Sequence, residues 1–167
     1  DYLMYDLGFL KVKILYGGDI FTKQEKKEIL EAFLIKIIAE WDLFLEKSLI
    51  HLTKDDTSKL SDFLGLNLPR QISFDTCQAI LNGLTYFDIK NCSNLKKLAK
   101  NILPQANNPF PHIESVIYSH IDDLYIIRNY VAHKSKASKR SLSNLYKKKN
   151  CSEFIEPGYY LLEEDKK

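Results

Sequence analysis

A run of apolar residues spaced by three or four positions between residues 22 and 51 constrains the fold of this chain more than any other feature. Thr22 and Glu25 have the spacing of a capping box, which is typical of a helix N-terminus. The apolar positions that follow lie on one face of a helix: Ile29, Phe33, Ile37, Trp41, Phe44 and Leu45. The pattern predicts a long amphipathic first helix that runs through Lys47 and reaches about His51.

A second stripe of the same kind lies late in the chain, after Pro111, a residue suited to the first turn of a helix. Its members are Ile113, Ile117, Ile121, Leu124, Ile127 and Val131. The spacing predicts a long helix that is central to the core.

Two shorter helices are predicted between these long ones. Residues 73–75 (Ser-Phe-Asp) offer caps for a helix that ends at Leu84. Ser93 is the expected cap of a helix from Asn94 to Leu103, and Pro104 ends it. Residues 104–111 are expected to form a loop.

The sequence near the two ends of the chain predicts a short strand and a basic helix. Before Gly17, apolar residues 10, 12, 14 and 16 alternate with lysines, as in a short strand. Near the other end, Ser138 or Ser141 is expected to begin a basic helix that ends near Asn150, and Pro157-Gly158 interrupts the chain before the acidic C-terminus.

The composition supports a helical domain. Of 167 residues, 45% are hydrophobic, too many for a disordered chain, and the length suffices for a core. Six Gly and five Pro are too few for the frequent turns of a β sandwich. We expect an all-α domain at residues 22–150, an N-terminal segment at 1–21 and an acidic C-terminal tail at 151–167.

The cysteines and the hydropathy pattern bear on location. Cys77, Cys92 and Cys151 are odd in number and form no Cys-x-x-Cys pair, which is typical of reduced thiols in a cytoplasmic protein. The longest apolar run, Ala32 to Trp41, is roughly half the length needed to cross a bilayer. We therefore expect a cytoplasmic protein with no membrane partner.

One cluster of residues late in the second long helix suggests chemistry: Arg128, Asn129 and His133. On a helical wheel Arg128 points into the apolar side, where a guanidinium is costly to desolvate unless it meets a carboxylate, a phosphate or a cleft. Arg128 and His133 lie about 140° apart, so one straight helix does not direct both at one phosphate. Two copies packed around a two-fold axis can line one composite site.

Other site chemistries have no matching motif. The sequence contains no phosphate-binding glycine loop, no His-Glu-x-x-His and no calcium loop, and its four histidines are scattered, so no metal site and no cofactor are expected. A structural alternative for the cluster stays open. In it, Arg128 pairs with a carboxylate such as Asp122 or Asp123, or one on another helix, and His133 is favoured at a helix C-terminus by the macrodipole.

The stretch from Leu124 to Leu142 resembles the HEPN superfamily, most closely its RiboL-PSP-type branch. The resemblance lies in Arg128, the polar Asn129 beside it, His133 after it and the basic helix that follows; Ala39-Glu40-Trp41 and Phe44-Leu45 are similar to the family's first helix. It implies an all-α bundle of four to five helices that forms a homodimer with a composite active site.

The resemblance also implies a function, that of a metal-independent endoribonuclease of a toxin-antitoxin or anti-phage system. In such an enzyme His133 serves as general base or acid, Arg128 binds the phosphate and stabilises the transition state, and Asn129 orients the phosphate or the histidine. Attack by the RNA 2′-OH leaves a 2′,3′-cyclic phosphate and a 5′-OH. Ser135 stands where toxins paired with a nucleotidyltransferase antitoxin have Tyr, so that partner is not carried over, whereas another antitoxin or an additional domain remains an expected kind of partner.

A basic stretch follows the motif. Seven cations occur without an acid between Lys134 and Lys149, and those nearest the motif are the candidate RNA-binding residues: Lys134, Lys136, Lys139 and Arg140. The alternative interpretation is a solvated helix face balanced by the acidic C-terminus.

Three functions therefore compete. The first is a ribonuclease acting on single-stranded or loop RNA, and the second is a non-catalytic HEPN module that binds RNA or protein and dimerises. The third is a purely structural helical domain in which Arg128 is a buried ion-pair partner.

Overall fold

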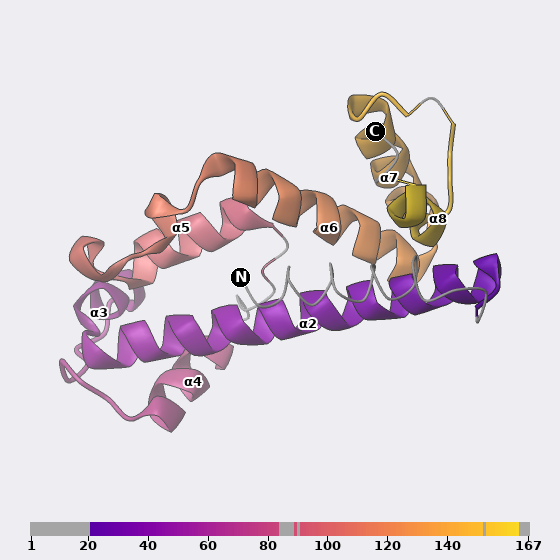
Figure 1. Cartoon of the computed structure of the whole chain (residues 1–167). Coiled ribbons are helices and arrows are strands. Elements are labelled where there is room, and N and C mark those ends of the chain that lie inside the picture. Colours follow the sequence, from indigo (N-terminus) through magenta and orange to yellow (C-terminus); the bar gives the residue numbers. More distant parts are fainter. Residues whose placement is uncertain (1–20, 84–88, 90, 152, 164–167) are drawn as a thin grey trace. The chain divides into compact units, whose positions relative to one another are not determined.

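The computed structural model describes residues 21–83, 89, 91–151 and 153–163 (Figure 1). These residues form seven α-helices, two short 3-10 helices and no strand, which confirms the all-α fold class. The strand predicted at residues 10–16 lies outside the described residues. Among the helices that are described, none is both long enough and apolar enough to cross a membrane.

The long first helix, α2 (Lys23–Asp55), begins as predicted. Thr22 Oγ1 accepts a hydrogen bond from Glu25 N at 3.2 Å, and Glu25 Oε2 accepts one from Thr22 N at 2.6 Å, so the capping box is confirmed. The helix continues four residues past His51, to Asp55.

The buried face of α2 matches the predicted stripe only in part. Ile37 and Leu45 are buried as predicted, whereas Phe44 is 55% exposed. The other most buried residues were not in the stripe: Leu30, Leu34, Ile38, Leu49 and Ile50. Residues 29, 33 and 37 and residues 30, 34 and 38 are two apolar lines on adjacent helix faces. Periodicity alone cannot choose between these two lines, and the prediction for Phe44 was wrong.

The other long helix, α6 (Ser115–His133), starts later than predicted. Pro111 belongs instead to the 3-10 helix η2 (Phe110–His112), and the extended backbone of Ile113 separates η2 from α6. The buried side chains of α6 include Tyr118, Tyr125 and Tyr130. Of the predicted stripe, Ile127 is buried as expected, whereas Ile117 is 48% exposed and was predicted wrongly. Tyrosine can be buried when its hydroxyl finds a partner, as Tyr118 does by donating to the Phe110 carbonyl at 2.6 Å.

The contacts divide the chain into two compact units. Unit 2 is residues 42–122 and holds α3 (Ser58–Leu64), α4 (Phe74–Gly83), α5 (Cys92–Ile102), η1 (Gln105–Asn107) and η2. Unit 1 comprises, among the described residues, 21–41 and 123–163, and holds α7 (Lys136–Lys148) and α8 (Pro157–Glu163). The helices α2 and α6 contribute residues to both units.

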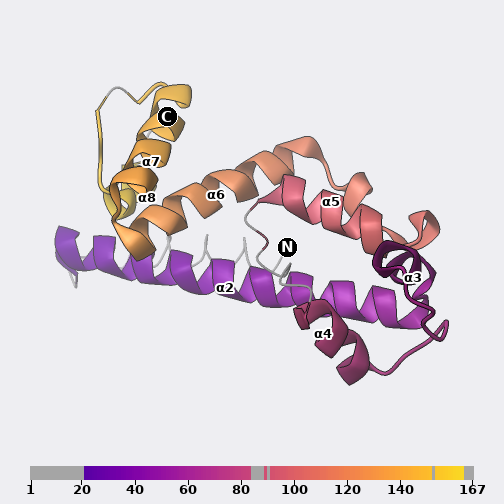
Figure 2. The same ribbon diagram turned by 180° about the vertical axis from the view of Figure 1, so that it is seen from behind.

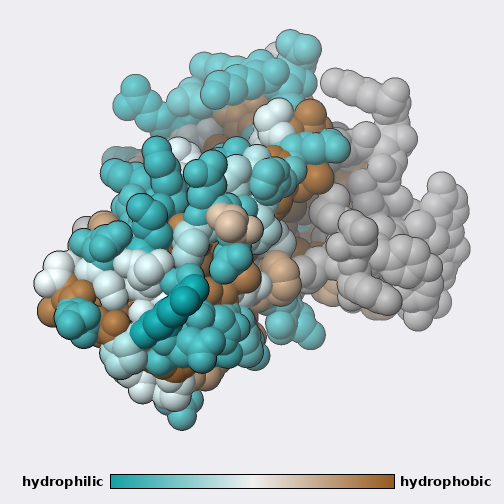
Figure 3. Space-filling view, turned by 90° about the vertical axis from the view of Figure 1, so that its left-hand side faces the viewer, coloured by the Kyte–Doolittle hydropathy of each residue, from teal (hydrophilic) through white to brown (hydrophobic). Residues whose placement is uncertain are grey.

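Unit 2 has an aliphatic core to which Leu60, Leu81, Leu95 and Ile102 contribute. Ser73 Oγ caps α4 by accepting from Thr76 N at 3.1 Å, as predicted. Helix α5, however, begins earlier than expected, because Asn91 rather than Ser93 is its cap and accepts from Asn94 N at 2.8 Å. Its end just before Pro104 is confirmed. Figure 3 shows apolar patches among polar residues on one face of the described part of the chain.

The C-terminal segment of unit 1 contains a helix that packs against α2, whereas the sequence predicted a tail there. Pro157 begins α8 rather than interrupting the chain, and Figure 2 shows α7 and α8 beside the N-terminal part of α2. Gly158 N donates to Glu31 Oε1 at 3.1 Å, and Tyr159 Oη donates to Gln24 Oε1 at 2.9 Å. We call this contact between residues 156–161 and residues 24–31 the clasp.

Candidate active site at the corner between α6 and α7

The three motif residues lie on the last two turns of α6, within unit 1. Arg128 and Asn129 are half-buried, and His133, the last residue of the helix, is exposed. An exposed imidazole at a helix end is accessible to a substrate. The five-residue separation of Arg128 and His133 on a regular helix keeps them about 140° apart, as expected from the sequence.

Arg128 packs against an aromatic ring. Its guanidinium carbon lies 5.7 Å from the ring centroid of Tyr125, whose side chain is buried. A cation over an aromatic face is favourable, so the contact with Tyr125 helps to hold the Arg128 side chain in place.

The two carboxylates proposed as structural partners of Arg128 are bonded to other groups. Asp122 Oδ1 accepts from Cys92 N at 2.7 Å, and Asp123 Oδ2 lies 2.7 Å from Lys149 Nζ. Each of these carboxylates keeps a second oxygen, so the structural alternative for Arg128 stays open beside the phosphate-binding one.

A two-residue corner, Lys134-Ser135, joins α6 to α7. Lys134 has φ of 45°, in the left-handed region, and its N–H donates to the Tyr130 carbonyl at 2.8 Å to end α6. Ser135 Oγ then accepts from Ser138 N, and Ser138 Oγ accepts from Ser135 N, both at 3.1 Å. Ser135 is therefore the cap of α7, and the prediction that the helix starts at Ser138 or Ser141 was wrong, because Ser138 acts as the reciprocal partner at the third helical position.

The candidate RNA-binding residues are exposed, but they lie in different local environments. Lys134, Lys136, Lys139 and Arg140 are all exposed. Lys139 Nζ, however, lies 4.5 Å from the ring centroid of Phe154. Lys136 and Arg140 instead lie on the side of α7 opposite its buried residues, Leu142, Leu145 and Tyr146.

Sequence reasoning left Lys147 out of the candidate set. About 20° separates it from Lys136 around the helix axis, and it is exposed. Lys147 could have been identified from its spacing of eleven residues from Lys136, which places both on one helix face. This holds only if the helix begins before Lys136, as it does in the structure. The neighbouring Lys149 differs, since it pairs with Asp123.

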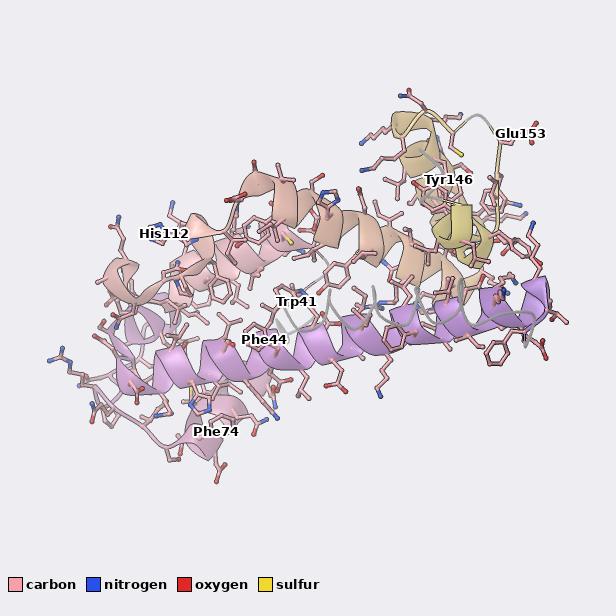
Figure 4. All side chains as sticks on the ribbon, viewed as in Figure 1. Trp41, Phe44, Phe74, His112, Tyr146 and Glu153 are labelled. Carbon is pink, nitrogen blue, oxygen red and sulfur yellow. The ribbon has the colours of Figure 1, made fainter. Side chains whose placement is uncertain are left out.

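The core of unit 1 contains several buried tyrosines, among them Tyr130 and Tyr146. Tyr130 Oη donates to Glu156 Oε1 at 3.1 Å, and its ring meets Phe154 edge-on at 5.5 Å. Burial, with the nearby Glu156, raises the pKa of Tyr130, so its hydroxyl stays a proton donor at neutral pH. Tyr146 lies between α7 and the segment that carries Glu153 (Figure 4), with its ring 4.4 Å from Tyr160.

The buried thiols are poor candidates for nucleophiles. Burial raises the pKa of Cys77 to about 11, and burial together with Asp122 raises that of Cys92 to about 12. Both thiols are therefore protonated at neutral pH. Across the described ranges, no three or more His, Cys, Asp or Glu side chains are grouped so as to hold a metal ion.

Comparison of this chain with protein-family models, with curated proteins and with solved structures found no match.

Proposed function

We propose that this chain is a metal-independent endoribonuclease of the HEPN type that acts in the cytoplasm in a toxin-antitoxin or anti-phage system. The observation that carries this proposal is the exposed His133 at the end of α6, close in sequence to Arg128-Asn129 and followed at once by a basic helix. RNA supplies its own nucleophile, so such a site needs a proton-transfer group and a cation for the phosphate.

In this mechanism each residue has a separate role. His133 accepts the proton of the 2′-OH or donates one to the departing 5′ oxygen, since an imidazole can serve as general base or general acid. Arg128 offers two parallel hydrogen bonds to the phosphate and stabilises the charge that develops on it. Asn129 orients the phosphate or the imidazole. The products are a 2′,3′-cyclic phosphate and a 5′-OH.

The angular separation of Arg128 and His133 favours a homodimer in this mechanism. Because the two side chains diverge on one helix, a second copy of α6 across a two-fold axis brings the arginine of one copy toward the histidine of the other. The same divergence also favours a second function, a non-catalytic module that binds RNA or protein and dimerises, because it leaves the motif of a single chain incomplete.

Cleavage in excess EDTA tests this function. Labelled tRNA and a structured messenger RNA are incubated with wild type, His133→Ala and His120→Ala, and the cleaved ends are analysed. Loss of general acid-base catalysis typically costs about 10²–10⁴-fold in rate, which is the decrease we expect for His133→Ala. His120 is the matched control, since it is exposed on the same helix but belongs to unit 2.

Three results would argue against a catalytic role. If wild type and His133→Ala cut equally, the activity belongs to a contaminant or to another site. If neither cuts and both bind RNA, the non-catalytic module is the better description. A sharp loss of thermal stability in Arg128→Ala, with no preference for RNA over other polyanions, favours the structural alternative.

A further inference from the structure

Three cations form a line along the outer face of α7: Lys136, Arg140 and Lys147. On a regular helix they fall within about 40° of one another and span about 16 Å along the axis. All three are exposed, whereas the opposite side of the helix is buried. We call these three residues the outer strip.

Some cations of the described residues are held in ion pairs: Lys149 pairs with Asp123, Lys27 with Glu31, and Arg70 with Asp56. The cations of the outer strip, like many other described lysines, are in no such pair, and they are distinguished by forming a row on a helix without acids. Within the part of the chain that the structure describes, no ion pair involves Lys136, Arg140 or Lys147, and α7 itself contains no Asp or Glu.

This arrangement costs stability. Lys136 and Arg140 are like charges four residues apart, which is destabilising on a helix surface. The polar residues Ser143 and Asn144 lie beside the line, and no large apolar side chain of α7 is exposed. A row of uncompensated cations with polar neighbours is complementary to a ligand that carries a row of anions.

We propose that the outer strip binds the backbone phosphates of single-stranded RNA that extends from the motif. This binding mode rests on the proposed function, because it makes α7 the surface that holds the strand next to the cut. Lys136 follows His133 by only three residues, across the two-residue corner, so the strip begins beside the exposed imidazole. A linear row of cations follows the backbone of a single strand.

Other anionic partners fit the strip less well. An amphipathic helix binds a lipid surface through an exposed apolar face, but Leu142, Leu145 and Tyr146 of α7 are at most 4% exposed. A base-paired strand is less suitable for in-line attack by its 2′-OH than an unpaired one, whose backbone can leave the A-form geometry.

Lys147 and Lys148 provide a matched pair of variants. They are adjacent, carry the same charge and are both exposed, but Lys148 lies about 100° from Lys147 around the helix and off the strip. We would measure the affinity of a fluorescein-labelled oligouridine by anisotropy over a range of salt concentrations. Both substitutions are made in the His133→Ala background, so the RNA stays intact.

We expect Lys147→Gln to weaken binding about 4-fold near physiological salt and to reduce the slope of log affinity against log salt by about 0.7, the value for one phosphate contact on a single strand. Lys148→Gln should change the affinity less than about 2-fold, since it removes charge without a contact. The triple variant Lys136→Gln/Arg140→Gln/Lys147→Gln should reduce the slope by about 2. Circular dichroism confirms that α7 is retained.

Several results would refute the proposal that the outer strip binds single-stranded RNA. Equal losses for Lys147→Gln and Lys148→Gln would show a diffuse charge effect. Equal affinity for a duplex, or equal competition by polyglutamate, would show that the surface does not select single-stranded RNA. These binding results are independent of cleavage. If wild type cuts RNA but Lys147→Gln and Lys148→Gln bind RNA equally, the proposed role of the outer strip is refuted and the proposed ribonuclease is not. If the strip is confirmed and wild type does not cut, the proposed enzyme fails instead.

Discussion

The corner between α6 and α7 and the clasp at the C-terminus belong to the same unit but are held together in opposite ways. At the corner, hydrogen bonds join residues three or four positions apart, Lys134 to Tyr130 and Ser135 to Ser138, on an exposed surface. At the clasp, they join residues 127 and 135 positions apart, Gly158 to Glu31 and Tyr159 to Gln24. The corner is specified locally, and the clasp exists only once the unit has folded.

This difference separates the two roles within unit 1. The corner places His133 beside the basic helix, and the clasp segment supplies Glu156, the hydrogen-bond partner of Tyr130 behind the motif. Substitutions in the clasp should therefore affect mainly stability, whereas substitutions in the corner should have small effects on stability and larger ones on the site.

The largest effect is expected from Gly158→Ala. A Cβ at Gly158 would lie 2.5 Å from the carbonyl oxygen of Lys27, which is backbone and cannot rotate away. Overpacking of this kind costs about 1–3 kcal/mol in the free energy of unfolding, which urea denaturation measures. Gly83→Ala in unit 2 is the matched control, because nothing lies within 4 Å of its Cβ position.

The control is expected to be unchanged or slightly more stable, since Ala is the better helix former. Equal destabilisation of the two variants would contradict the close approach of α8 to α2. Retained stability in Gly158→Ala would show that the clasp opens at little cost.

A smaller effect is expected from Ser135→Ala, which removes the cap of α7. Loss of such a cap costs about 1 kcal/mol in the free energy of unfolding. Ser141→Ala is the control, because Ser141 Oγ only donates to the Ala137 carbonyl within the same helix. If the two variants are equally stable in urea, α7 does not depend on the corner for its start.

The parts of the fold that the sequence predicted are the parts that depend on near neighbours. The capping box of Thr22 and Glu25 and the end of α5 before Pro104 are local, and both were predicted. Cap choice failed where several cap-forming residues compete, as with Asn91 and Ser93. The clasp was missed because its partners are remote in sequence, so Pro157-Gly158 resembled a simple break.

The candidate site shows the same division. The sequence predicted that Arg128 and His133 diverge on one helix, since that follows from helix geometry alone. It did not predict the contact of Arg128 with the Tyr125 ring, because the predicted stripe was aliphatic and did not include Tyr125. Lys147 was omitted because a helix that begins at Ser138 or Ser141 leaves Lys136 outside it, whereas the cap at Ser135 brings Lys136 and Lys147 onto one helix face.

The smallest effect, and the one that isolates the corner, is expected from Lys134→Gly. A left-handed φ of 45° costs an L residue about 1–2 kcal/mol, and Gly avoids that cost while losing some backbone entropy. Lys134→Ala is the matched control because it removes the same charge but keeps the Cβ. We expect the Gly variant to be more stable in urea by about 0.5–1 kcal/mol. Both variants should bind RNA with equal affinity, since they lose the same cation. If Gly is not the more stable, the corner is held by packing rather than by its local conformation, and the contrast with the clasp no longer stands.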